Sequence, residues 1–252
     1  MTVVTFRQLH HGDRPFVLPN AWDVASALAF AEAGYPAIGT TSFGLAAAAG
    51  DPDGDRSARE ATRNLVGRLR SLPCHLTADV EDGYSDDPAE VAEYVASLDV
   101  AGVNLEDSLA GRLVDPARHA AKIAAVKARV PDVFVNARVD TYWSAQDVPD
   151  TLARAQSYVD AGADGVFVPG PITRDALRDL AAAIPVPLNV LPILPLGELA
   201  ELGVRRVSTG SLPHRAAIDT AVAVAATIRD GHPAPKATPY PDMQARLTRF
   251  QA

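Results

Sequence analysis

The sequence predicts a (β/α)8 barrel of the TIM type, because short apolar segments alternate with helical segments along most of the chain. Eight such pairs follow one another at roughly even spacing between residues 16 and 228. The strands are short and apolar, as expected for parallel strands that are covered on both faces. A doubly wound open sheet is the competing fold, but it usually has fewer strands and a glycine-rich phosphate loop after the first one. The segment after the first strand, Pro19–Trp22, contains no glycine, so the barrel is favoured.

The first half of the chain supplies four strand–helix pairs after a helical lead-in over residues 1–15. Asp23 can cap the first helix, and Gly34 can end it. The expected strands are 16–20, 37–42, 75–81 and 102–106, and the helices after the last three are 57–71, 88–98 and 116–129.

The second half supplies four more pairs and a C-terminal extension. The expected strands are 133–139, 165–168, 187–191 and 206–209, and the helices are 148–161, 173–183, 196–202 and 213–228. We expect residues 1–230 to form the catalytic barrel and residues 231–252 to form a proline-rich arm with one further helix over 242–250. A helix on such an arm cannot bury its apolar face alone, so we expect it to pack on a partner subunit.

Composition excludes several classes of function. The chain of 252 residues has 48% hydrophobic and 21% charged residues, which is typical of a globular domain. Its net charge of −8 argues against a nucleic-acid-binding or anionic-membrane surface. The single cysteine, Cys74, excludes an internal disulfide and is expected to be a packing residue. No signal peptide or membrane-spanning run is recognisable, so a cytoplasmic protein is expected.

Two acidic residues at the end of the third strand are the first candidate for chemistry. The segment Leu76–Tyr84 reads LTADVEDGY, and Asp79 and Glu81 would point to the same face of an extended strand. Two neighbouring carboxylates are unfavourable unless a cation lies between them, and Mg²⁺ commonly binds one or two carboxylates together with water and substrate. The alternative is an exposed acidic strand end beside a turn at Asp82–Gly83.

The ends of the other strands favour the metal site, because TIM-barrel active sites lie at the C-terminal ends of the strands. Glu106 ends the fourth strand, beside the third, and Arg138 ends the fifth. A solvated acidic face would not place its charges at successive strand ends.

Five motifs occur in order between residues 16 and 215: AIGTTSFG, DPDG, DVEDGY, NLED and NARVD. With them the chain resembles the isocitrate lyase/phosphoenolpyruvate mutase superfamily, in particular its short methylisocitrate-lyase-like bacterial branch. The resemblance implies a Mg²⁺-dependent barrel that acts on 2-oxo or 2-hydroxy carboxylates through an enolate of a pyruvate-like fragment. It also implies a homo-oligomer, a dimer or a tetrameric dimer of dimers, whose last helix is exchanged between subunits.

The resemblance also implies roles for individual residues. Asp79 matches the direct metal ligand, and Glu81 and Glu106 match acids that hold metal-bound water. Arg138 matches the arginine that neutralises the substrate carboxylate or the enolate oxygen. The remaining matches are Thr41, Ser42 and Phe43 in the carboxylate-binding loop, Asp53 on the loop after the second strand, and Asn189 as a pocket amide.

One part of the family pattern is missing. The carbon–carbon lyases carry a K-[KR]-C-G-H motif after the fourth strand, and the mutase carries an Asn–Ser pair there, whereas this chain has SLAGRLVDP. The remaining acid–base candidates are Tyr84, Asp53 and His214, and Trp22 is expected to form a pocket wall. His119, His10 and His11 are expected at the surface.

We therefore expect a Mg²⁺-dependent lyase that cleaves a carbon–carbon bond, or decarboxylates, next to a 2-oxo or 2-hydroxy carboxylate. The expected partners are a small carboxylate substrate and further copies of the chain, with neither nucleic acid nor membrane. Carbon–phosphorus bond chemistry on a phosphonopyruvate-like acid and a non-catalytic carboxylate-binding protein are the alternatives.

Overall fold

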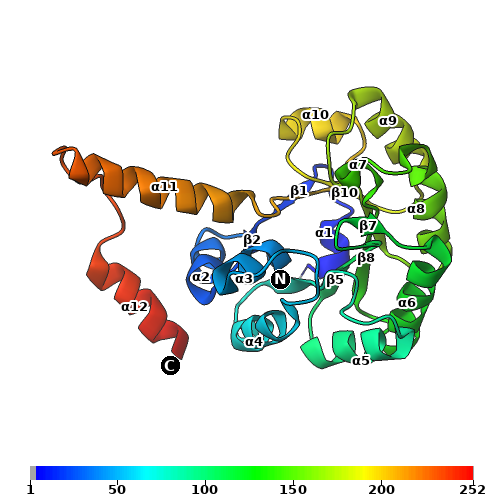
Figure 1. Cartoon of the computed structure of the whole chain (residues 1–252), viewed down its shortest axis with the longest axis horizontal. Coiled ribbons are helices and arrows are strands. Elements are labelled where there is room, and N and C mark those ends of the chain that lie inside the picture. The colour runs from blue at the N-terminus through cyan, green and yellow to red at the C-terminus, as the bar shows by residue number, and fades with distance from the viewer. Residues whose placement is uncertain (1–3, 252) are drawn as a thin grey trace.

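The computed structural model describes residues 4–251 and shows a closed, mostly parallel barrel (Figure 1). Its main sheet has nine strands in the order β1-β11-β10-β9-β8-β5-β4-β3-β2. The first and last in this order, β1 (Phe16–Leu18) and β2 (Asn20–Ala21), are consecutive parts of one stretch. Since β1 pairs with β11 (Arg206–Ser208) and β2 pairs with β3 (Ala37–Thr40), this stretch closes the sheet into a barrel with eight strand positions. The predicted TIM-barrel fold is confirmed.

Proline explains why the closing stretch is divided. Pro19 has no N–H group to donate to a neighbouring strand. Its carbonyl accepts a hydrogen bond from the Gly39 N–H at 2.9 Å, whereas the Leu18 carbonyl accepts one from the Thr209 N–H at 3.0 Å. The stretch therefore changes its hydrogen-bonding partner at Pro19, from β11 to β3.

The other strands lie within the ranges expected from the sequence. They are β4 (His75–Asp79), β5 (Gly102–Glu106), β8 (Phe134–Arg138), β9 (Gly165–Phe167) and β10 (Leu188–Val190).

Seven of the helices lie around the barrel where the sequence predicts them (Figure 1). They are α2 (Val24–Glu32), α4 (Arg59–Leu69), α5 (Pro88–Leu98), α6 (Pro116–Arg129), α8 (Thr151–Asp160), α9 (Arg174–Ala183) and α10 (Leu196–Glu201). Their starts follow ordinary capping rules, since the Asp23 carboxylate accepts a hydrogen bond from the Ser26 N–H at 2.7 Å. Both α5 and α6 begin with proline after a capping aspartate.

Several short elements differ from the prediction. The lead-in contains one helical turn, α1 (Phe6–Leu9), and residues 1–3 of the predicted segment lie outside the described residues. Helix α3 (Ser42–Ala49) follows β3 directly, where a loop was expected, because four consecutive alanines favour a helix and Thr41 caps it. The remaining additions are the hairpin β6 (Ser108–Leu109) and β7 (Arg112–Leu113), helix α7 (Thr141–Ser144) and a 3-10 turn, η1 (Val148–Asp150).

Two histidines expected at the surface are buried. His10 is 1% exposed, and its ring stacks on Phe134 with 4.0 Å between centroids. His119 is 0% exposed and faces inward on α6 together with Lys122, Ile123 and Val126. Burial lowers the pKa of both imidazoles to about 3. The buried residues of α6 are three or four positions apart in the sequence, and this spacing could have predicted that His119 is buried.

The C-terminal helices leave the barrel ring. Helix α11 (Leu212–Arg229) extends outward, and α12 (Tyr240–Gln251) folds back beyond the arm (Figure 1). The one residue that α11 buries within the described chain is His214. Helix α12 contacts α2 of its own chain, since Arg246 and Arg249 form ion pairs with Glu32. Exposed apolar side chains therefore lie on both helices, Ile218 and Val222 on α11 and Tyr240 on α12.

Residues 4–251 contain no helix that combines the length and the apolar character needed to cross a membrane.

Candidate active site

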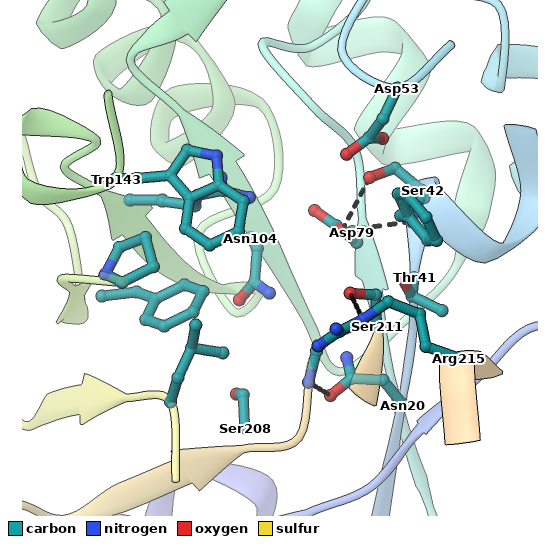
Figure 2. Close-up of a pocket in the computed structure, with 16 residues that line it drawn as sticks. Asn20, Thr41, Ser42, Asp53, Asp79, Asn104, Trp143, Ser208, Ser211 and Arg215 are labelled. Carbon is teal, nitrogen blue, oxygen red and sulfur yellow. Dashed lines mark hydrogen bonds between the residues drawn. The ribbon is translucent and has the colours of Figure 1, made fainter. Parts of the chain in front are cut away.

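A pocket of about 320 Å³ opens at the C-terminal ends of the strands (Figure 2). Six of the site residues predicted from the sequence line it: Thr41, Ser42, Phe43, Asp53, Asp79 and Arg138. The lining is completed by residues for which the sequence predicts no role: Asn20, Asn104, Trp143, Phe167, Pro169, Leu191, Ser208, Gly210, Ser211 and Arg215.

Asp79, the last residue of β4, has one satisfied and one unsatisfied carboxylate oxygen. Its Oδ2 accepts hydrogen bonds from the Ser42 N–H at 3.2 Å and from the Ser42 hydroxyl at 3.0 Å (Figure 2). Its Oδ1 is buried and has no partner among the described residues. Burial raises the pKa of Asp79, as expected for a carboxylate that lacks a nearby counter-ion on one side.

Glu81 is held in a similar state just beyond β4. Its Oε2 accepts a hydrogen bond from the Arg56 N–H at 2.8 Å, whereas the buried Oε1 has no partner in residues 4–251. Burial is the main cause that raises the pKa of Glu81 to about 7. No group of three histidine, cysteine or acidic side chains in the described part of the chain forms a ready-made metal cluster. A cation here would therefore need water or substrate oxygens besides the carboxylates, as Mg²⁺ commonly does.

Arg138, the last residue of β8, is held between two acids. Its Nε donates to Asp140 Oδ1 at 2.6 Å, and its Nη1 donates to Glu106 Oε1. Burial acts to lower the pKa of Arg138, but the charges of Asp140 and Glu106 outweigh it and raise the pKa. The guanidinium also lies 5.7 Å from the centre of the Trp143 ring, so its position is fixed before a ligand binds.

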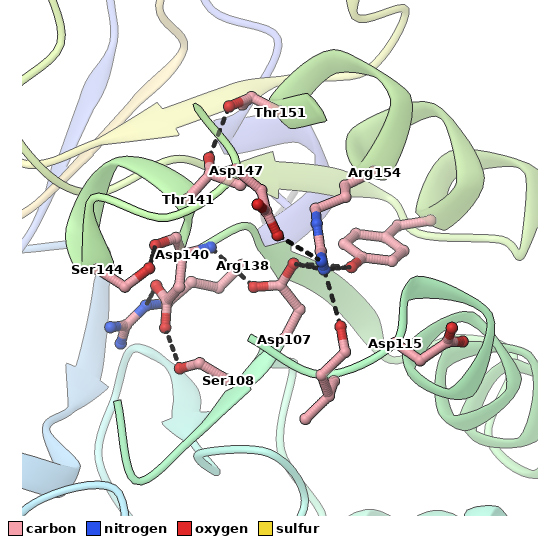
Figure 3. A network of polar contacts seen from close by, with 12 residues as sticks. Asp107, Ser108, Asp115, Arg138, Asp140, Thr141, Ser144, Asp147, Thr151 and Arg154 are labelled. Carbon is pink, nitrogen blue, oxygen red and sulfur yellow. Dashed lines mark hydrogen bonds and ion pairs between the residues drawn. The ribbon is translucent and has the colours of Figure 1, made fainter. Parts of the chain in front are cut away.

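A polar network behind Arg138 supports this position (Figure 3). The second oxygen of Asp140 accepts a hydrogen bond from the Ser108 hydroxyl at 2.5 Å, and the Asp140 N–H donates to Asp107 at 2.8 Å. Asp107 in turn accepts hydrogen bonds from Tyr158 at 2.7 Å and from Arg154 at 3.1 Å. Since Tyr158 and Arg154 belong to α8, the network anchors the Arg138 side chain to a barrel helix.

The turn after β4 is anchored by ion pairs. Asp82 bonds to Arg56 at 2.5 Å and to Lys122 at 2.9 Å. Burial alone would raise the pKa of Asp82, but the hydrogen bonds from Arg56 and Lys122 outweigh it and lower the pKa. Gly83 has φ +93°, and a Cβ there would lie 2.5 Å from Val91 Cγ1, so this turn requires glycine.

Comparison with known proteins identifies the family. A family model described as phosphoenolpyruvate phosphomutase matches residues 6–229. The chain belongs to the phosphoenolpyruvate phosphomutase family. This result confirms the resemblance that the five sequence motifs indicate.

Individual known proteins resemble the chain to different degrees. An uncharacterized protein of Mycobacterium tuberculosis is 52% identical over 252 residues, and this match covers 98% of each chain. The crystal structure of a putative phosphonomutase from Burkholderia cenocepacia is 40% identical with a TM-score of 0.81, covering 87% of this chain and 97% of that one. The 2-methylisocitrate lyase of Bacillus subtilis is 31% identical over 196 residues, which are 73% of this chain and 64% of that protein. The named relatives thus include a lyase and a putative phosphonomutase.

In this member of the phosphoenolpyruvate phosphomutase family, several predicted site residues lie behind the pocket wall. The Tyr84 hydroxyl lies 3.0 Å from the Thr62 hydroxyl, because Tyr84 has φ +61° and the turn directs its ring toward the core. Trp22 and His214 pack edge-on against each other, 5.3 Å between centroids, and do not line the pocket. Asn189 donates to the Ser208 hydroxyl at 2.9 Å rather than lining the pocket itself.

Proposed function

We propose that the protein is a Mg²⁺-dependent lyase that cleaves a carbon–carbon bond, or decarboxylates, next to a 2-oxo or 2-hydroxy carboxylate. The bond would break through an enolate of a pyruvate-like fragment. The observation that carries this proposal is that one pocket combines an unsatisfied carboxylate, Asp79, with a fixed guanidinium, Arg138. The first group suits a cation and the second an anion, so the pocket suits a metal together with an anionic ligand.

The carboxylates fit a Mg²⁺ site, because Asp79 Oδ1 and Glu81 Oε1 are buried without partners in the described residues. Asp79 would bind the metal directly, and Glu81 and Glu106 would hold metal-bound water. When bound, Mg²⁺ supplies electrostatic stabilisation of the negative charge that develops on the substrate oxygens.

The substrate carboxylate would be held between Arg138 and the start of α3. Ser42 and Phe43 form the first turn of this helix, and both line the pocket. The Phe43 N–H has no backbone acceptor in the part of the chain that the structure describes. The free Phe43 N–H group and the helix dipole favour an anion at this position, as does the planar fork of Arg138 donors.

A second cation at the pocket rim supports a dicarboxylate substrate. Arg215 lines the pocket, and its Nε donates to the Ser211 hydroxyl at 3.3 Å (Figure 2). Arg215 has no acidic partner within residues 4–251. A distal carboxylate, as in an oxaloacetate-like acid, would neutralise this charge.

Asp53 is the proposed proton carrier in place of the missing loop cysteine. It lies at the pocket rim on the loop between α3 and α4. Desolvation by the pocket is the main cause that raises its pKa, which favours the protonated form. From the rim, its carboxyl can deliver a proton to the carbon that loses its substituent.

The alternative of carbon–phosphorus chemistry is supported by the 40% identical relative, which is described as a putative phosphonomutase. The alternative of carboxylate binding without catalysis is supported by the hairpin β6–β7, which carries no cysteine or histidine in the place of the family motif.

The proposal is tested by calorimetric titration with oxalate, a planar dianion that resembles the enolate of pyruvate, with Mg²⁺ or with EDTA. We expect binding that EDTA removes and that Asp79→Asn weakens by at least about tenfold. Asp51→Asn, on the exposed part of the same pocket loop, is the control and should bind as the native protein does. Equal binding with EDTA and with Mg²⁺ would reject the metal assignment.

Release of pyruvate or carbon dioxide from 2-oxo, 2-hydroxy and phosphono acids then separates the three functions. Mg²⁺-dependent turnover of a dicarboxylate supports the lyase, whereas turnover confined to phosphono acids supports carbon–phosphorus chemistry. Oxalate binding without turnover of any acid supports the binding protein.

A further inference from the structure

The interior of the barrel below the pocket is polar. Four side chains there, Asn104, Asn136, Asn189 and Ser208, are at most 4% exposed, and Arg206 is 0% exposed. TIM-barrel interiors are usually filled by branched apolar side chains. The polar groups therefore need a reason, and their hydrogen bonds supply one.

We propose that Arg206 is a positioning residue that makes Asn104 and Ser208 hydrogen-bond donors on the floor of the pocket, where they bind an oxygen atom of the anionic ligand. This inference rests on the proposed function, because it concerns the same ligand. It adds a second recognition element that lies below Asp79 and Arg138.

Arg206 is a buried cation that forms no ion pair within the described chain, and the effect of burial on its pKa is only partly offset by the charge of Asp79. Its Nε donates to Ser208 Oγ at 3.0 Å, and its Nη2 donates to Asn104 Oδ1 at 3.0 Å. Its Nη1 is buried without a partner, and no acid forms an ion pair with it within the described chain. Burial lowers the pKa of Arg206 to about 9, so the group is still charged at neutral pH. A buried charge of this kind is unfavourable unless an opposite charge approaches it, and an anion in the pocket would provide that charge.

The contact with Arg206 fixes the orientation of the Asn104 amide. A guanidinium has donors and no acceptor, so the amide atom that faces it must be the oxygen. The same Oδ1 also accepts a hydrogen bond from Asn136 Nδ2 at 2.9 Å. The Asn104 Nδ2 group therefore points away from both, and Asn104 lines the pocket (Figure 2). This NH₂ group donates to no atom of residues 4–251, which leaves it available to a ligand.

The contact with Arg206 also orients the Ser208 hydroxyl. Its oxygen accepts one hydrogen bond from Arg206 Nε and another from Asn189 Nδ2 at 2.9 Å. A hydroxyl accepts two hydrogen bonds and donates one, so its remaining capacity is the O–H donor. Ser208 lines the pocket, and Asn189, which was expected to be a pocket amide, acts from behind it. The floor thus presents two donors above a positive charge, which suits a carboxylate or enolate oxygen and disfavours a cation or an amide NH₂.

Substitution of Asn104 by aspartate tests the inference most directly. Asn104→Asp keeps the shape and can still accept the hydrogen bond from Arg206, so the fold should be retained. It replaces the donor in the pocket by an acceptor, and we expect the Mg²⁺-dependent affinity for oxalate to fall by about tenfold or more. Ser208→Ala removes the other donor and should lower the affinity by severalfold. The control is Thr77→Val, because Thr77 is buried in the same barrel interior but does not line the pocket.

Arg206→Met tests whether Arg206 acts through these two donors. We expect it to weaken oxalate binding in the native background but to add little in the Ser208→Ala, Asn104→Asp double variant, since groups that act together are not additive. If Arg206→Met fails to fold, the two single variants still decide the inference. Folded Asn104→Asp protein that binds oxalate as tightly as the native protein would overturn it. Native protein that does not bind oxalate would instead reject the proposed function on which it rests.

Discussion

Arg138 is held on both sides by acids before any ligand arrives, and this geometry leads to the first prediction. A lysine ammonium is a point donor and cannot reach Asp140 and Glu106 while also presenting a planar fork to a carboxylate. We expect Arg138→Lys to lower the affinity for oxalate by about tenfold to a hundredfold and to leave Mn²⁺ binding, measured by calorimetry, nearly unchanged. Arg174→Lys, at an exposed ion pair, is the control. Parallel loss of metal and oxalate binding would show that Arg138 shapes the metal site instead.

The buried imidazole of His119 predicts an acid-sensitive stability. Both of its ring nitrogens lack partners in the described structure, and burial lowers its pKa to about 3 from an unfolded value of about 6.5. Between these values the unfolded chain binds a proton that the folded protein does not, so the free energy of unfolding falls as the pH falls from about 6.5 toward 3. Stability is therefore greatest above about pH 6.5 for this group.

The variant His119→Leu removes this proton linkage. We expect the loss of unfolding free energy between about pH 7 and about pH 5 to be smaller in the variant by about 2 kcal/mol, as measured by urea denaturation. The comparison uses the difference between the two pH values, so a constant packing cost of the substitution cancels. An identical pH dependence in both proteins would contradict the prediction.

At the level of single residues, the sequence predicts strand ends well and side-chain directions poorly. Asp79 and Arg138 line the pocket because residues at the C-terminal ends of barrel strands must lie at that mouth. Tyr84 does not line the pocket, because its left-handed backbone angle directs the ring toward the core. No local sequence pattern reveals this backbone angle. Asn104 and Ser208 could have been found, because each lies two residues from another inward-facing residue of the same strand, Glu106 and Arg206 respectively.

The turn between β4 and α5 connects the acid pair to the rest of the barrel, and its glycine gives a prediction at the level of the element. Gly83→Ala places a Cβ against Val91 at a positive φ, so we expect the free energy of unfolding to fall by about 1–3 kcal/mol. Gly67→Ala is the control, because Gly67 lies in helix α4 and a Cβ added there would meet no atom within 4 Å. That substitution should raise stability by about 0.5–1 kcal/mol. Urea denaturation measures both, and a shift of the same sign in the two variants would be inconsistent with this account.

The long helices can be predicted from the sequence, because the spacing of their apolar residues and the position of their capping residues indicate the same boundaries. Examples are α5 and α6, whose boundaries match the prediction. The shorter ones depend on tertiary contacts. The hairpin β6–β7 turns at Ala110 and Gly111, both with positive φ, and the Ala110 N–H donates to the Gly54 carbonyl at 2.8 Å. Strands of two residues are too short to show a sequence pattern, so this hairpin cannot be predicted without knowing its contact with the loop at Gly54.

At the scale of the whole molecule, α11 is the element that the isolated chain leaves unexplained. It has 18 residues, and Ile218 and Val222 are 51% and 65% exposed. A helix that packs on nothing is marginal in water, so this face needs a cover. We propose that a second copy of the chain provides it, so that α11 takes part in the exchange between subunits together with the last helix.

Charge on the α11 face should therefore separate the subunits. We expect the Ile218→Asp, Val222→Asp double variant to be a monomer by light scattering at concentrations where the native protein is a dimer or larger, because burying two carboxylates in an apolar contact is strongly unfavourable. Leu152→Asp is the control, since Leu152 is a comparably exposed apolar residue, 40% exposed, on barrel helix α8. A native protein that is itself monomeric, or a double variant with the native mass, would show that α11 needs no second copy. Arg215 belongs to the first turn of α11 and lines the pocket. A monomeric variant should therefore lose more affinity for acids with a distal carboxylate, such as oxaloacetate-like acids, than for oxalate.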